Sequence, residues 1–185
     1  LLSHFKITHE ALYLVEGPVN LVRLMAVPDM VDRPELKFPP YTASTPTYLS
    51  NGRSVIQAAA KQDILLHHPY QSFEPIVQFI REAAHDPDVV AIKMTIYRTG
   101  SNSELVRELM AAALAGKQIT VVVELMARFD EANNANWAQY LEDAGAHVVY
   151  GVYGYKVHAK MALVVRREQG NLKRYAHLGT GNYHQ

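Results

Sequence analysis

Three side chains near residue 160 have the types and spacing of a phosphate-handling site. Lys156, His158 and Lys160 alternate along an otherwise apolar stretch, and alternate residues of a β-strand point to the same face. Two flanking ammonium groups disfavour protonation of the imidazole, and a neutral imidazole is the form that attacks as a nucleophile. The same ammonium groups attract phosphate. The pattern also fits a surface strand with three solvated polar side chains, and both interpretations stay open at this point.

A glycine-rich turn follows this pattern in the sequence. Gly179 and Gly181 flank Thr180, and His177 and Asn182 lie on either side. Glycines let the backbone approach a ligand closely, and successive backbone amides can bind an anion. Asn182 is in a position to orient a neighbouring histidine. A Gly-Thr-Gly sequence alone fits a simple tight turn as well, and its spacing from the histidine pattern is what favours a ligand site.

Two arginines come at the ends of predicted strands. Arg98 follows an apolar, β-branched run over 89–97, and Arg128 follows a second run over 118–126. The carboxyl ends of parallel strands form the ligand crevice of an open α/β sheet, and two guanidinium groups there would bind phosphate oxygens in pairs. The alternative is that the arginines form structural salt bridges, for example to Asp130.

Two charged residues fall inside these predicted strands, Lys93 and Glu124. A charged side chain inside a strand that is covered on both faces must be paired. We therefore predict a cross-strand ion pair between Lys93 and Glu124.

Strands and helices alternate from residue 62 onward. Such alternation indicates right-handed crossovers and a mostly parallel sheet with helices on both faces. The last two strands are instead predicted to form a hairpin, which makes the sheet mixed. Strands are predicted at 63–66, 89–97, 118–126, 147–150, 157–165 and 172–178. His67 and His68, at the end of the first of these, would line the edge of the sheet, but they do not have the spacing of a metal site. Helices are predicted after Ser72, at 101–115 with a capping box of Ser101 and Glu104, and at 131–144.

The first 60 residues differ from the rest. Five of the nine prolines fall between residues 28 and 46, which excludes a regular helix or a central strand there. We therefore expect residues 1–60 to be the end of an upstream domain with a proline-rich connector, and residues 61–185 to form an incomplete α/β domain. Short helical segments are predicted after Thr8 and over 19–26 and 54–61.

Composition excludes several classes of function. Lys and Arg number 18 and Asp and Glu number 18, so the chain lacks the broad basic surface of a nucleic-acid-binding protein. The absence of cysteine excludes a disulfide framework, a thiol nucleophile and a cysteine zinc site. The longest apolar runs, such as 121–123, are too short to span a membrane. The chain begins without Met and ends straight after the glycine-rich turn, and we expect it to be a piece of a longer protein.

These motifs together resemble bacterial polyphosphate kinases of the first type. The resemblance extends over the whole chain, and several long motifs in the right order make it specific. It implies that residues 1–60 end the head domain and that residues 61–185 form most of the first C-terminal domain, which has the fold of a phospholipase D-like half-module. The matching stretches are 16–20, 63–73, 91–98, 123–131, 156–160 and 175–183.

The resemblance implies a reversible transfer of the terminal phosphate of ATP to polyphosphate through a phosphohistidine. His158 matches the histidine that is phosphorylated, and Arg98 and Arg128 match two arginines linked to a magnesium site. A guanidinium group has no lone pair for a metal, so we expect both arginines to hold phosphate beside Mg²⁺. The other implied site residues, which contact the phosphoryl group or support the pocket, are Lys160, His177 and Asn182.

The implied partners are ATP and ADP, inorganic polyphosphate, and the second C-terminal domain of the same parent chain. That domain would carry a second essential histidine beyond Gln185, so we expect this chain to be inactive, or nearly so, by itself. The resemblance further implies that the full-length protein is a homo-oligomer in the cytoplasm or at the inner membrane surface.

Two other functions stay open. The wider phospholipase D pattern His-x-Lys-x-x-x-x-Asp is met by His158 and Lys160, but Val165 stands at the Asp position, which speaks against a phosphodiesterase. A phosphodiesterase would hydrolyse a chromogenic phosphodiester. A non-catalytic module that binds polyphosphate or nucleotide would still bind after His158→Ala and would form no phosphorylated intermediate.

Overall fold

The structure is a computed structural model that describes residues 2–50, 52–100, 102–127 and 130–183. The chain forms two compact units, Leu1–Tyr41 and Thr42–Gln185. None of the helices in the described ranges combines the length and the apolar character needed to cross a membrane.

The first unit contains only short helical turns. No residue of these turns is buried. Most helical stability comes from packing of an apolar face, so turns without a packed face stay short. The short helical segment predicted after Thr8 is present only as a single 3-10 turn, His9–Ala11. The turns are α1 (Leu2–Phe5), η1 (His9–Ala11), η2 (Leu21–Ala26), α2 (Val27–Met30) and η3 (Pro34–Leu36).

The second unit is built on a five-stranded mixed sheet with the strand order β3-β2-β1-β4-β5, which confirms the mixed α/β class. β1 pairs with β2 and β2 pairs with β3 in parallel, whereas β4 is antiparallel to both β1 and β5. Parallel and antiparallel pairs are thus equal in number, because the hairpin is added on the free edge of β1. The strands are β1 (Val89–Ile96), β2 (Gln118–Val123), β3 (His147–Tyr150), β4 (Lys160–Glu168) and β5 (Asn171–Gly179).

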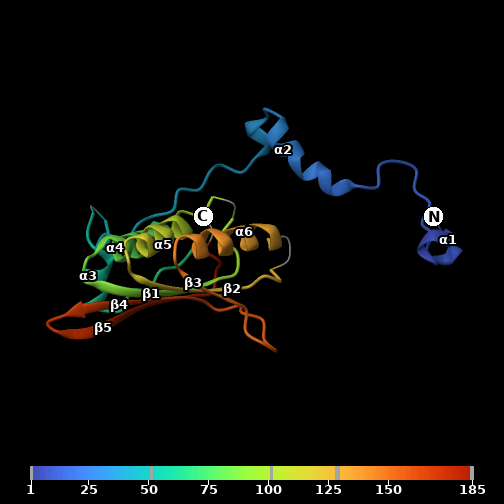
Figure 1. The fold of residues 1–185 in the computed structure, drawn as a ribbon. Helices are drawn as coiled ribbons and strands as arrows, with labels where there is room; N and C mark the ends of the chain where they lie inside the picture. The colour runs from blue at the N-terminus through green and yellow to red at the C-terminus, as the bar shows by residue number, and fades with distance from the viewer. Residues whose placement is uncertain (1, 51, 101, 128–129, 184–185) are drawn as a thin grey trace. The chain divides into compact units, whose positions relative to one another are not determined.

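Three helices, α4, α5 and α6, lie side by side on one face of this sheet (Figure 1). The alternation of strands and helices had predicted helices on both faces. The two parallel crossovers, β1-α5-β2 and β2-α6-β3, step across the sheet in the same direction. Crossovers of one hand that step in one direction place their helices on the same face. The helices of this unit are α3 (Val55–Ala59), α4 (Glu74–His85), α5 (Glu104–Leu114) and α6 (Glu131–Asp143).

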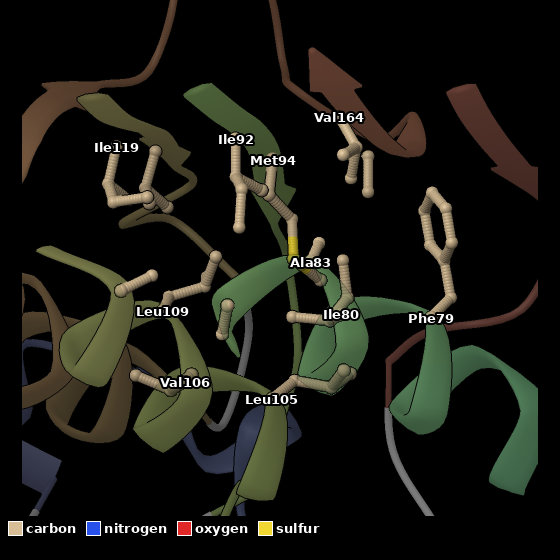
Figure 2. Packing of buried hydrophobic residues seen from close by; sticks show 14 of the residues in the cluster. Phe79, Ile80, Ala83, Ile92, Met94, Leu105, Val106, Leu109, Ile119 and Val164 are labelled. Atoms are coloured by element: carbon tan, nitrogen blue, oxygen red, sulfur yellow. The ribbon is translucent and has the colours of Figure 1, made fainter. Parts of the chain in front are cut away.

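The core lies between these helices and the sheet (Figure 2). Ile80 of α4 and Leu109 of α5 are completely buried, and so are Ile92 of β1 and Val164 of β4. The helical spacing of the apolar residues in 76–83 therefore predicted the buried face of α4 correctly.

Three details differ from the sequence prediction. Residues 63–66 form no strand, although Ile64 and Leu66 pack against the core while Leu65 is exposed. The cap of α5 is Ser103, whose hydroxyl accepts a hydrogen bond from the Val106 amide at 3.4 Å; Ser101, half of the predicted capping box, lies outside the described residues. The strand β4 begins only at Lys160.

The hairpin turn is tighter than predicted. Gln169 and Gly170 have φ angles of 48° and 80°, and two successive positive φ angles are typical of the two-residue type I′ turn that joins antiparallel strands. The strands therefore continue to Glu168 and restart at Asn171.

Glu82 of α4 binds the segment before it into the second unit. Its carboxylate accepts hydrogen bonds from the Ser54 hydroxyl at 2.7 Å and from the Val55 and Ile56 amides at 3.0 and 3.1 Å. Those two amides are at the start of α3, where amides have no partner within the helix. Since Val55 and Ile56 are also buried in the core, the second unit begins well before residue 61. The boundary at 60 concerns the domains of a longer protein and stays a prediction.

We expect Glu82→Ala to lower the free energy of unfolding by about 2 kcal/mol, because several donors to one carboxylate lose their acceptor. Urea unfolding of this chain measures the change. Glu74→Ala is the matched control, because Glu74 lies on the same helix but is half-exposed and pairs with Arg81 at the surface; it should change the stability by less than about 1 kcal/mol. Equal losses in the two variants would contradict the role of Glu82.

Candidate active site

Four basic side chains gather around one aromatic ring, that of Tyr97. The amino groups of Lys160 and Lys156 lie 4.8 and 5.7 Å from the ring centroid, and the guanidinium carbon of Arg98 lies 5.3 Å from it. The His158 imidazole meets the same ring edge to face at 4.8 Å. We call these four side chains and the ring the Tyr97 cluster. It brings together residues of the predicted histidine pattern and the arginine at the end of β1.

Within this cluster, Lys160 points at one ring nitrogen of His158. Its amino group lies 3.0 Å from His158 Nε2. A charged lysine can only donate a hydrogen bond, so Nε2 accepts it and the imidazole is neutral, with its proton on Nδ1. Lys160 is only 4% exposed, and burial, followed by the nearby Arg98 charge, lowers its pKa. The nitrogen with the lone pair is therefore the one that faces the buried cation.

The backbone around His158 is fixed to β1 by one hydroxyl. Thr95 donates to the Ala159 carbonyl at 2.7 Å and accepts from the Met161 amide at 3.1 Å. This hydroxyl replaces ladder contacts where β4 has not yet begun, because residues 156–159 lie outside the strand. The residue after His158 thus has a fixed place although it is not in a strand.

The residue before His158 is fixed by a buried carboxylate. Glu124 accepts hydrogen bonds from the Val157 amide at 2.8 Å and from the Met126 amide at 2.9 Å. The predicted Lys93–Glu124 ion pair is wrong: Lys93 is exposed and faces Thr120 and Leu163 in the strand register. Since β2 ends at Val123, Glu124 lies just past the strand, where backbone amides are available to it.

Arg98 has a carboxylate partner. Its guanidinium Nε lies 3.1 Å from Asp130 Oδ2, and its side chain is 34% exposed. The salt bridge that the sequence offered as an alternative is therefore present, together with the contact to Tyr97. Arg128 lies outside the described residues.

Asn134 of α6 is a residue that the sequence analysis missed. Its side-chain amide nitrogen donates to the carbonyls of Tyr97 and Glu124, each at 2.8 Å, and the residue is 1% exposed. It therefore joins the chain just past β1 to the chain just past β2. A signal was present, because Asn134 shares the buried helix face with Ala138 and Leu141, and a polar residue on an apolar face needs a partner.

The glycine-rich turn reaches the same edge of the sheet. Met94 pairs with Ala162, so the carboxyl end of β1 lies beside the start of β4, and Lys160 pairs with Gly179 at the end of β5. A Cβ atom at position 179 would lie 3.0 Å from the His177 ring. A side chain at position 179 would therefore crowd this ring, and the strand pairing makes the two sequence motifs neighbours in space.

His177 is half-buried and neutral. Its Nδ1 lies 2.8 Å from the Tyr183 hydroxyl, and burial, followed by the charge of His68, lowers its pKa to about 4. The side-chain oxygen of Asn182 is buried without a hydrogen-bond partner among the described residues. Tyr183 therefore orients His177, and a role for Asn182 stays a prediction.

The chemistry of this site favours phosphate over a directly bound metal. Within the described ranges, no three His, Asp or Glu side chains lie close enough to hold a metal ion. Mg²⁺ prefers carboxylate oxygens and phosphates, whereas the side chains here are mainly cations, which bind phosphate oxygens.

Comparison with known proteins agrees with this geometry. Residues 54–185 match the family of the polyphosphate kinase C-terminal domain 1. The chain is 71% identical over 185 residues to a polyphosphate kinase of Neisseria meningitidis serogroup C (strain 053442) and 58% identical over 188 residues to one of Burkholderia cenocepacia (strain HI2424). Both comparisons cover 100% of this chain and 27% of the relative.

A solved structure also matches. The crystal structure of polyphosphate kinase from Porphyromonas gingivalis is 33% identical in sequence, with a TM-score of 0.72, and the match covers 96% of this chain and 30% of that one. The chain thus spans less than a third of the length of these proteins. With more than half of its residues matched by one family, the chain belongs to the family of the polyphosphate kinase C-terminal domain 1.

Proposed function

We propose that this chain is part of an enzyme that transfers the terminal phosphate of ATP to polyphosphate, reversibly, with His158 as the phosphorylated residue. The observation that carries the proposal is the Lys160 amino group 3.0 Å from His158 Nε2, inside a cluster of cations. Membership of the polyphosphate kinase family supports the same reaction. We also propose that the fold is that of a phospholipase D-like half-module.

In the first step, His158 Nε2 attacks the γ-phosphorus of ATP. The N–P bond forms, the bond from phosphorus to the β,γ-bridging oxygen breaks, and ADP leaves with the electron pair on that oxygen. Phosphoryl transfer needs positioning and cationic stabilisation more than covalent help. Lys160 is placed to give up its hydrogen bond to Nε2 and bind the phosphoryl oxygens as the N–P bond forms.

In the second step, a terminal oxygen of polyphosphate attacks the same phosphorus. The N–P bond breaks and its electron pair returns to Nε2, which restores the neutral imidazole. The reverse reaction uses the same atoms, since ADP oxygen can attack the phosphohistidine in place of polyphosphate. A nucleophile that splits one difficult transfer into two is the role expected of His158.

Arg98 and Arg128 are proposed as the phosphate clamp. Mg²⁺ is proposed to enter bound to the phosphates of the nucleotide, because the described side chains form no group that could hold it directly. His177 and Asn182 are proposed to support the pocket. The second C-terminal domain of a longer parent protein, which forms a homo-oligomer, is proposed to complete it, so this chain alone is expected to be inactive or nearly so.

We expect γ-phosphate-labelled ATP with Mg²⁺ to give an acid-labile, base-stable label on His158 of the parent protein, and His158→Ala to remove it. The matched control is His147→Ala, because His147 is an exposed histidine on β3 and should keep the label. Labelling of the parent protein but not of this chain alone would mean that the second domain is needed for the first step.

Three results would contradict this proposal. A label that persists in His158→Ala would place the nucleophile elsewhere. Unchanged binding of polyphosphate with no label in any variant would favour a binding module, and hydrolysis of a chromogenic phosphodiester would favour a phosphodiesterase.

We expect the stability of the chain to fall as the pH drops from 6.5 to about 4, because His177 has a lowered pKa in the folded state. In this window the unfolded state binds a proton that the folded state does not, so unfolding is favoured as the pH falls; the stabilisation is complete above 6.5. The two pKa values correspond to about 3 kcal/mol.

Urea unfolding across this pH window measures the effect. His177→Gln removes the titrating group and should flatten the pH dependence, whereas His147→Gln at an exposed position should keep it. An unchanged slope in His177→Gln would show that other groups cause the pH dependence.

A further inference from the structure

The Tyr97 ring is the only aromatic group that the described residues place against all four basic side chains of the cluster. The four come from two parts of the chain: Arg98 follows β1, whereas Lys156, His158 and Lys160 lie just before β4 and at its first residue. Tyr97 itself is 9% exposed. The ring is therefore a buried common contact for the neutral imidazole of His158 and for three cations that would otherwise repel one another.

Few carboxylates neutralise these cations. Among the described residues, Asp130 pairs with Arg98, and no carboxylate lies within 4 Å of the amino groups of Lys156 or Lys160. Glu124 lies just past β2 at this edge of the sheet, but its carboxylate binds two backbone amides rather than the lysines. The cations are thus held mainly by something other than negative charge.

An aromatic ring can hold a cation without adding charge. The face of the ring carries a negative quadrupole that attracts ammonium and guanidinium groups within about 6 Å of the centroid, and the three distances here fall in that range. A carboxylate at the same place would attract the cations more strongly, but it would also repel phosphate. The ring keeps the cluster assembled and leaves its positive charge available to an anion.

The ring makes these contacts independently of the tyrosine backbone. The Tyr97 carbonyl accepts a hydrogen bond from the side chain of Asn134 at 2.8 Å, while the ring contacts the four basic groups. A change of side chain at 97 can therefore alter the ring and leave the path of the chain in place.

We propose that Tyr97 is a positioning residue whose ring holds Lys156, Lys160, Arg98 and His158 in one phosphate-facing arrangement. The proposal rests on the proposed function, because it assigns to the ring the placement of Lys160 against the attacking nitrogen. The ring does not touch the reacting phosphorus. It acts through the cations, which transfer their contacts from the ring to the phosphate when the anion arrives.

The experiment uses the full-length parent protein with three changes at position 97. Tyr97→Leu keeps the apolar volume and removes the ring, Tyr97→Phe keeps the ring and removes the hydroxyl, and a series of increasingly fluorinated phenylalanines keeps the shape while weakening the negative face. The readouts are the initial rate of His158 labelling from ATP and the affinity for inorganic tripolyphosphate. Thermal unfolding of each variant reports whether it folds.

We expect Tyr97→Leu to lower the labelling rate and the tripolyphosphate affinity by roughly 10- to 100-fold, and Tyr97→Phe to restore both to within a few-fold, since phenylalanine also binds cations. Both quantities should fall step by step along the fluorinated series. A packing role would not produce this trend, because the fluorinated rings have nearly the same shape.

Two results overturn the inference while the proposed function stands: His158 is labelled equally fast in Tyr97→Leu, or the fluorinated series shows no trend. If the protein with Tyr97 shows no His158 label, the proposed function fails, and the tripolyphosphate affinities across the same series still decide whether the ring holds the cations. If Tyr97→Leu does not fold, the fluorinated series decides alone.

Discussion

The buried carboxylate of Glu124 is the constraint on which the rest of the site depends. A charge taken out of water must be compensated by close partners, and here they are the backbone amides of Met126 and Val157. The second of these lies 33 residues further along the chain. The end of β2 and the approach to His158 are therefore parts of one structure, because their separation would remove the hydrogen bond between Glu124 and the Val157 amide.

The sheet topology explains why these groups meet. Parallel strands place the ends of β1 and β2 at one edge of the sheet, and the antiparallel pairing of β4 with β1 brings the start of β4, just after His158, to that same edge. Thr95 and Glu124 then hold the residues on either side of His158. A fourth parallel strand on this side of β1 would have begun at the opposite edge, and a histidine just before it would lie far from Arg98.

The sequence predicted the helices and most of the strands of this unit, and it singled out His158 and Lys160, because periodicity and residue type are local properties. It missed Tyr97 and Asn134 as site residues. The Tyr97 ring contacts basic side chains, and the Asn134 amide binds two backbone carbonyls, and only the folded topology brings these partners near. The Lys93–Glu124 pair failed for a related reason. A strand end misplaced by three residues, at Met126 rather than Val123, changes which groups lie within reach of a carboxylate.

A chain without net charge can still present a strongly cationic site, because the fold gives some of its cations carboxylate partners and others an aromatic partner. At the far end of β4, Arg166 is surrounded by three carboxylates, those of Asp86, Asp88 and Glu168, and an anion there would meet as much repulsion as attraction. At the near end, Lys156 and Lys160 have an aromatic ring in place of carboxylates. The balance of charges over the whole sequence therefore says little about anion binding. The chemical nature of each cation's partner instead indicates the end of the sheet at which we propose that a phosphate chain binds.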